Sequence, residues 1–218
     1  AMEVKPILLG VLASGRGSNF EAILRKQSYG YFARAQVACL IVNNADAGAI
    51  AIAKQYGVPH HVVLQREFPS KDAYEVEIVR LLKSYGVEYV ILAGYMRIVG
   101  PPLLEAYPQR ILNIHPALLP SFPGLHAQRQ ALEYGVKISG CTVHFVDAGV
   151  DSGPIIVQRA VPVLPGDTEE TLSARILEQE HIAYSEAIKM VTEEPWEIRG
   201  RVVHFPQREP RESEGKKV

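Results

Sequence analysis

The sequence predicts an α/β protein with a Rossmann-like, doubly wound, mostly parallel sheet, a C-terminal antiparallel part and a long C-terminal helix. Three observations support this prediction. Apolar runs that resemble buried strands alternate with helical patterns through the first half of the chain, which is typical of a parallel sheet. Two later strand-like runs are separated only by a loop rich in Gly and Asp, as in a hairpin. The final periodic segment is long enough for one extended helix.

The N-terminal half alternates regularly between the two patterns. Strands are predicted over residues 7–13, 35–42, 62–64 and 89–92. Three helices are predicted between and beside them: one that ends near residue 27, one over about 47–56 and one over 71–85. The last of these helices has the clearest pattern, because Tyr74, Ile78 and Leu81 recur at helical spacing. A short helix over 101–107 and a strand over 111–115 follow.

The pattern changes after residue 115. Residues 139–146 and 155–163 are predicted to form a hairpin or near-hairpin, and residues 168–191 a long helix that begins with a cap-like sequence at Thr168. Residues 197–205 are consistent with a final strand. Residues 207–218 are charged and contain no apolar residue before Val218, so we expect a disordered tail.

The composition is that of an ordinary globular domain. The 218 residues are 47% hydrophobic and 22% charged, with a net charge of −1. We expect one domain over residues 1–206, with a phosphate-binding half of about 5–100 and a catalytic, folate-binding half of about 101–206. The near-neutral charge argues against nucleic-acid binding, and the lack of a long apolar run or signal sequence favours a cytoplasmic protein without membrane contact. The oligomeric state stays open, a homodimer included.

The two cysteines carry no signal for a metal. Cys39 and Cys141 each lie in an apolar strand-like run, without metal-ligand spacing. We expect buried free thiols, and a single disulfide stays an alternative. His60 and His61 also lack a Cys or an acid at ligand spacing, so no metal site is predicted.

Asn113, His115 and Asp151 form the most informative combination of residues. Asn113 and His115 lie two apart on the predicted strand, so their side chains share a face, and Pro116 ends that strand. An amide and a protonated imidazole can stabilise a developing oxyanion. A carboxylate can orient the imidazole, favour its protonated form or help to move protons. Each residue alone would more often be structural, so the prediction depends on their combination with segment 116–126.

The glycine-rich turn Ser14-Gly15-Arg16-Gly17-Ser18-Asn19 follows the first strand and opens the first helix. Glycines permit a ligand to approach the backbone closely, and free N–H groups at a helix start favour an anion. The third glycine and the acidic strand end of a dinucleotide site are both missing, as is the Gly-Lys-Ser/Thr of a Walker loop. The turn therefore favours a monophosphate, and a turn without a ligand is the alternative.

Segment 113–126, Asn-Ile-His-Pro-Ala-Leu-Leu-Pro-Ser-Phe-Pro-Gly-Leu-His, closely resembles the folate-dependent formyltransferases, and the likeness covers about residues 5–192. Within that family the chain is most similar to the branch that acts on phosphoribosylglycinamide. The resemblance implies transfer of the formyl group of 10-formyltetrahydrofolate, a co-substrate, to the amine of that ribonucleotide in de novo purine biosynthesis. It implies direct transfer through a tetrahedral intermediate, without a metal.

The resemblance also assigns roles to particular positions. The catalytic residues are Asn113, His115 and Asp151, and the substrate phosphate binds Gly15, Arg16, Gly17, Ser18 and Asn19, with the role of the Arg16 side chain left open. The substrate amine and ribose contact Glu180 and Pro116. The folate contacts Lys71, Met96, Arg97, Ile98, Val99, Asp147, Ala148, Gly149 and Val150. His126 and His144 are expected to be packing or supporting residues.

Other functions fit the sequence less well. Methionyl-tRNA formyltransferases carry an additional RNA-contacting domain, formyltetrahydrofolate hydrolases carry an N-terminal regulatory domain, and sugar-amine formyltransferases are usually larger. We expect none of these additions here. Outside the family, a non-catalytic phosphoribosyl-binding module would bind the ribonucleotide without transferring a formyl group.

Overall fold

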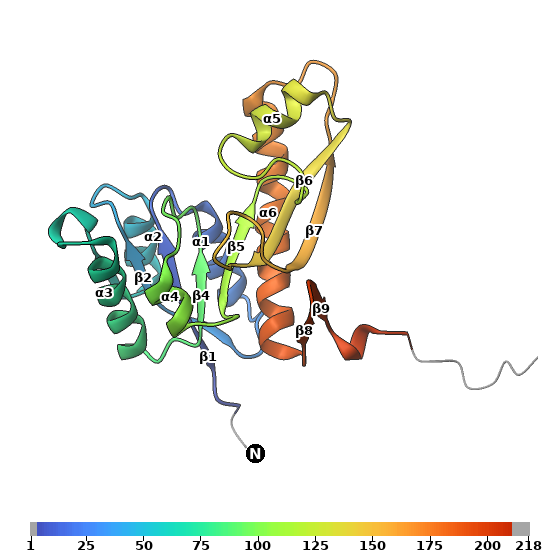
Figure 1. Cartoon of the computed structure of the whole chain (residues 1–218). Helices are drawn as coiled ribbons and strands as arrows, with labels where there is room; N and C mark the ends of the chain where they lie inside the picture. The colour runs from blue at the N-terminus through green and yellow to red at the C-terminus, as the bar shows by residue number, and fades with distance from the viewer. Residues whose placement is uncertain (1–3, 211–218) are drawn as a thin grey trace, which may run out of the picture.

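The computed structural model describes residues 4–210, and residues 1–3 and 211–218 lie outside the described part. Its strands are β1 (Ile7–Ala13), β2 (Ala35–Val42), β3 (His60–Val62), β4 (Tyr89–Leu92), β5 (Ile111–His115), β6 (Ile138–Phe145), β7 (Ile155–Pro162), β8 (Glu197–Arg199) and β9 (Val202–His204). They form one nine-stranded sheet in the order β3-β2-β1-β4-β5-β6-β7-β9-β8 (Figure 1). Strands β1 to β5 are parallel, whereas β6 is antiparallel to both β5 and β7. The predicted fold class is confirmed.

Helices cover both faces of the sheet. They are α1 (Ser18–Ser28), α2 (Ala49–Tyr56), α3 (Lys71–Ser84), α4 (Pro101–Ala106), α5 (Ala127–Tyr134) and the 25-residue α6 (Glu169–Glu193). One core joins the sheet to α1, α2 and α6, and a second joins its other face to α3 and α4. The long β6–β7 hairpin extends beyond the parallel strands, where α5 and α6 lie beside it (Figure 1). Among the described residues, no helix combines the length and apolar character needed to cross a membrane.

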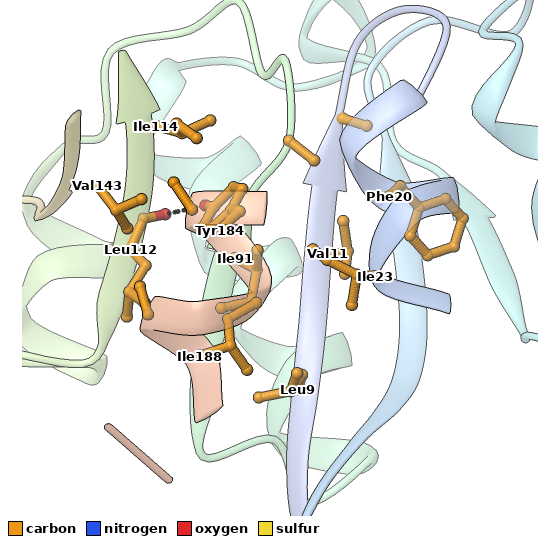
Figure 2. Packing of buried hydrophobic residues seen from close by; sticks show 14 of the residues in the cluster. Leu9, Val11, Phe20, Ile23, Ile91, Leu112, Ile114, Val143, Tyr184 and Ile188 are labelled. Carbon is orange, nitrogen blue, oxygen red and sulfur yellow. Dashed lines mark hydrogen bonds between the residues drawn. The ribbon is translucent and has the colours of Figure 1, made fainter. Parts of the chain in front are cut away.

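The long helix α6 is anchored at its start and along its length. Thr168 accepts a hydrogen bond from the Thr171 N–H, and the Thr171 hydroxyl accepts from the Thr168 N–H, so the predicted cap-like start is a true capping box. Figure 2 shows Ile188 and Tyr184 of this helix packed among the central strands.

Tyr184 fixes the place where β4 and β5 separate. The paired part of these strands ends at Ile91 and Leu112. Beyond it, the buried Tyr184 hydroxyl lies 2.7 Å from the Leu92 carbonyl oxygen and 2.9 Å from that of Leu112 (Figure 2). The hydroxyl therefore lies within hydrogen-bond distance of one carbonyl from each strand and links α6 to the ends of β4 and β5.

The structure differs from the sequence predictions at four places. The strand predicted at 62–64 is formed by His60–Val62, and the single strand predicted at 197–205 is two short strands, β8 and β9, separated by a turn in which Gly200 has a φ of +61°. Helix α5 was not predicted. The beginning of the predicted disordered tail is folded, because Pro206–Arg208 form a 3₁₀ turn in which Arg208 binds Glu194. The rest of that tail, residues 211–218, lies outside the described residues.

Candidate active site

The sheet topology places the predicted site residues at one end of the molecule. β1 and β4 are neighbours in the sheet. The chain continues from β1 to β2 on one side of this pair and from β4 to β5 on the other side. The loops after the two strands therefore diverge and leave a crevice at their carboxyl ends, where doubly wound sheets bind ligands. The glycine turn follows β1, residues 93–99 follow β4, and Asn113 and His115 lie at the end of β5.

The glycine turn is fixed by its neighbours. Gly17 precedes α1 with a φ of +75°, and a Cβ atom there would lie 2.8 Å from the Ala49 Cβ. Gly15 is exposed, and a Cβ atom at this position would meet no atom within 4 Å. The Ser14 hydroxyl accepts a hydrogen bond of 2.8 Å from the Met96 N–H, which joins the turn to the loop after β4. No side chain caps the start of α1, so its first N–H groups face the crevice without a side-chain acceptor.

Glu180 of α6 reaches the start of α1. Its Oε1 accepts a buried hydrogen bond of 3.2 Å from Asn19 Nδ2. Burial raises the pKa of the Glu180 carboxyl, and the hydrogen bond from Asn19 offsets part of that rise. Asn19 Oδ1 is buried and has no hydrogen-bond partner among the described residues. A buried carboxylate and an open acceptor thus lie beside the predicted phosphate turn, although residue 180 is remote from it in sequence.

The three predicted catalytic residues meet. Asp151 Oδ2 lies 3.4 Å from His115 Nδ1 and accepts a hydrogen bond of 2.8 Å from the Gly124 N–H. Asp151 has a φ of +50°, a strained conformation that Asp tolerates better than most residues. Asn113 lies on the same strand as His115 and lines a cleft together with Asp151. The carboxylate is therefore aimed back at the strand end from the loop between β6 and β7.

The groups that contact the His115 ring indicate which of its nitrogens carry a hydrogen. His115 Nε2 lies 2.7 Å from the Phe122 carbonyl oxygen, which can only accept, so this nitrogen carries a proton. A second proton on Nδ1 would make a charge-assisted hydrogen bond to Asp151, whereas a lone pair there would face the carboxylate. Both ring nitrogens are therefore engaged by the protein.

His144 was expected to be a packing or supporting residue, and the structure places it against Asn113. It pairs with Asn113 across the β5–β6 ladder and lines the same cleft. Its Nδ1 lies 3.1 Å from the Phe145 carbonyl oxygen, which can only accept, so Nδ1 donates. In the neutral ring Nε2 then has no hydrogen, and it accepts from Asn113 Nδ2 at 3.4 Å. Burial lowers the pKa of His144, which favours this neutral form. His144 Nε2 also lies 3.8 Å from Asp151 Oδ1. The ring orients the Asn113 amide.

The predicted folate positions separate into two adjoining clefts. The first is lined by Leu92, Tyr95, Arg97, Ile98, Val99, Asn113, His144, Val146, Asp147, Gly149, Val150 and Asp151. The second lies beside the glycine turn and is lined by Ser14, Asn43, Asn44, Ala45, Asp46, Leu64, Arg66, Met96 and Arg97. Arg66 was missed by the sequence analysis, because a charged residue in a turn carries no pattern. Lys71 begins α3 and, like Ala148, lines neither cleft.

The described residues contain no group of three or more His, Cys, Asp or Glu side chains placed to hold a metal ion. Cys39 and Cys141 are both free and buried, as predicted, and burial raises the pKa of each thiol to about 12.

Comparisons with known proteins agree with this geometry. The formyl transferase family matches residues 9–188. The phosphoribosylglycinamide formyltransferase of Bacillus subtilis is 43% identical over 184 residues, which cover 83% of this chain and 92% of that protein. The crystal structure of glycinamide ribonucleotide transformylase 1 from Symbiobacterium toebii has a TM-score of 0.90 and 52% identity, with 92% of this chain and 94% of that chain covered.

A longer protein contains a similar region. The trifunctional purine biosynthetic protein adenosine-3 of Drosophila pseudoobscura pseudoobscura is 47% identical over 186 residues, and the chain spans 14% of its length. The matched residues 9–188 include the glycine turn, Asn113, His115, Asp151 and Glu180. On its sequence, its fold and the arrangement of these residues, the chain belongs to the formyl transferase family.

Proposed function

We propose that this chain is an enzyme that transfers the formyl group of 10-formyltetrahydrofolate to the amine of phosphoribosylglycinamide, a step of purine biosynthesis. The observation that carries the proposal is the position of Asn113, His115 and Asp151 near the end of β5, at the same edge of the sheet as the glycine turn after β1. The names of the similar Bacillus and Symbiobacterium proteins support the choice of acceptor.

The acceptor lies along the crevice at the carboxyl ends of β1 and β4 and reaches the end of β5. Its phosphate binds the uncapped N–H groups at the start of α1, near the exposed backbone of Gly15. The buried Asn19–Glu180 pair then faces the ribose and the glycine amine, where open acceptor oxygens can bind their hydrogens. Pro116, which directly follows β5, is a candidate contact for the reacting amine.

The reaction needs an oxyanion site and a route for one proton. The neutral amine attacks the formyl carbon, and the carbonyl oxygen becomes an oxyanion. Asn113 donates to this oxygen, because its amide already faces the cleft and His144 holds its orientation. The amine then loses a proton, which Asp151 helps to pass to N10 of the folate as the bond between N10 and the formyl carbon breaks.

His115 joins the oxyanion site only after a small rearrangement. Both of its N–H positions face protein groups, Phe122 on one side and Asp151 on the other. For Nε2 to donate to the intermediate, the Phe122 carbonyl has to move away. Phe122 and His126 both have positive φ values in this segment, so the chain between β5 and α5 is held in a strained form that such a movement could release.

The folate occupies the two adjoining clefts. Its ring lies in the cleft formed by Arg97–Val99 and Asp147–Val150, next to Asn113 and Asp151. The glutamate tail carries carboxylates, and the neighbouring cleft offers the guanidinium groups of Arg66 and Arg97. These two arginines are therefore better candidates for the tail than Lys71.

A coupled assay tests the proposal. Purified protein is mixed with 10-formyltetrahydrofolate, and release of tetrahydrofolate is followed by absorbance with and without phosphoribosylglycinamide. The proposal requires rapid release that depends on the ribonucleotide. Equal release with and without it, together with formate, would identify a hydrolase instead. Binding of the ribonucleotide without any release would identify a non-catalytic module.

A further inference from the structure

The loop that carries Asp151 has few internal supports. It runs between β6 and β7, and residues 147–150 are exposed. Within it, Asp147 Oδ1 accepts hydrogen bonds from the Gly149 N–H at 2.9 Å and from the Ser152 hydroxyl at 2.7 Å. These bonds shape the first part of the loop. They do not by themselves fix the strained residue Asp151 relative to the end of β5.

A contact from the C-terminal hairpin reaches the other side of the loop. Arg201 lies in the turn between β8 and β9, and its Nη2 donates a hydrogen bond of 2.6 Å to the Ser152 carbonyl oxygen. Ser152 is thus bound at its hydroxyl by Asp147 and at its carbonyl by Arg201. The Ser152 carbonyl belongs to the peptide between residues 152 and 153, so this bond restrains the backbone one residue beyond Asp151.

The hairpin itself is attached to the sheet. Val202 of β9 pairs with Ile155 of β7, and Ile198 and Val203 pack against the main core. A charge-assisted bond from such an anchored turn restrains a loop more effectively than one from a free side chain, because less mobility is lost on forming it. Residue 201 lies outside the region 9–188 that the formyl transferase family matches.

We propose that Arg201 is a positioning residue that holds the Asp147–Gly153 loop from outside, so that Asp151 stays aligned with His115. Arg201 lines a pocket with Val150 and Asp151, and its hydrogen bond to the loop is the one to the Ser152 carbonyl. The consequence for catalysis rests on the proposed function, whereas the restraint on the loop does not. Loss of the bond lets the Asp151 carboxylate drift from the imidazole, and small misplacements of a catalytic group reduce turnover strongly.

Arg201→Ala tests the proposal, with Arg199→Ala as the matched control. Arg199 lies on the same hairpin and is exposed, and its ion pair is with Glu197, not with the loop. We expect Arg201→Ala to lower kcat about 10-fold through misplacement of Asp151, with the KM for the ribonucleotide within about twofold of the parent. Arg201→Lys, which keeps a donor, should recover part of the rate. Arg199→Ala should match the parent.

Hydrogen exchange gives a second readout that needs no catalysis. Backbone amides of residues 147–153 should exchange faster in Arg201→Ala than in the parent and in Arg199→Ala, with unchanged exchange in β1 and β4. If Arg201→Ala and Arg199→Ala have equal kcat and equal exchange, Arg201 is not a positioning residue. If exchange rises in an Arg201→Ala protein whose parent transfers no formyl group, the restraint stands and the proposed function fails.

Discussion

Asp151 is the residue on which the proposed chemistry depends most. One carboxylate contacts the His115 ring, the Gly124 backbone and, at longer range, His144. The Asp151→Asn variant keeps the shape of the side chain and an oxygen that can accept from Gly124, but loses the charge. We expect turnover to fall by about 10²- to 10⁴-fold, the usual effect of losing acid–base assistance.

Steady-state kinetics of the Asp151→Asn variant measure this loss, and circular dichroism checks the fold. Both KM values should stay close to the parent, because the carboxylate acts on protons and not on binding. Turnover within a factor of two of the parent would remove Asp151 from the mechanism.

Glu180, which we propose to bind the substrate, lowers the stability of the folded protein at neutral pH because its carboxyl is buried. Its folded pKa is raised by burial, so the folded protein holds the proton at pH values where the unfolded chain has lost it. The associated destabilisation is absent below the unfolded pKa of about 4.3, grows as the pH rises through the folded pKa, and is complete above it. Glu180→Gln removes this destabilisation and keeps an oxygen that can accept from Asn19.

Thermal unfolding of Glu180→Gln should therefore show a Tm above the parent at pH 7, by about 2–4 °C for each kcal/mol, and an equal Tm near pH 4. The same variant should bind the ribonucleotide more weakly, because a charge beside the amine is lost. A Tm difference that is constant with pH would contradict a titrating Glu180.

At the scale of elements, the turn between β1 and α1 offers a sharp test of phosphate binding. Gly17→Val is a poor choice, since the positive φ and the contact with Ala49 would disturb the fold itself. Gly15 has no such constraint, so Gly15→Ala adds a methyl group that only a ligand would meet. We expect the KM for the ribonucleotide to rise about tenfold, which corresponds to about 1.4 kcal/mol.

The folate KM and the Tm of Gly15→Ala serve as internal controls and should match the parent. If the KM values for both substrates rise equally, or neither changes, the turn does not bind the phosphate.

The elements with a regular hydrophobic pattern were predicted well from sequence, and the irregular ones were not. Apolar periodicity records burial, not hydrogen bonding. The apolar run at 62–64 shifted the strand prediction towards the buried Val63, whereas the residues paired with β2 are His60–Val62, and Val63 only continues that ladder with a hydrogen bond from its N–H to the Val42 carbonyl. Helix α5 follows His126 in a left-handed conformation without a side-chain cap, so its start has no recognisable signature.

The site residues could be predicted where the residue types and their spacing along one strand both indicated a site. Asn113 and His115 share one strand, and the strand period alone places them together. Contacts between segments that are distant in the sequence leave no pattern in it. The bond from Arg201 to Ser152 and the orientation of Asn113 by His144 are of this kind, because both depend on how distant segments pack.

At the scale of the whole molecule, the site joins the two predicted halves of the chain. Arg97 and Ile98 come from the first half and line the cleft proposed for the folate ring with Asp147 and Val150 from the second. Glu180 returns from the C-terminal helix to the glycine turn near the N-terminus. Neither half therefore holds a complete binding region, and Tyr184 ties the strands of both halves beneath the crevice.

We propose that the formyl carbon moves directly from folate to the acceptor amine at the Asn113–His115–Asp151 site. The most direct measurement follows a ¹³C-labelled formyl group by NMR in one reaction with the parent and one with Asp151→Asn. With the parent, we expect the label to appear as a formamide on the ribonucleotide. With Asp151→Asn, the rate at which this signal grows should be lower by about 10²-fold or more. Label that accumulates as free formate, or that reaches the ribonucleotide equally fast in both reactions, would contradict the proposal.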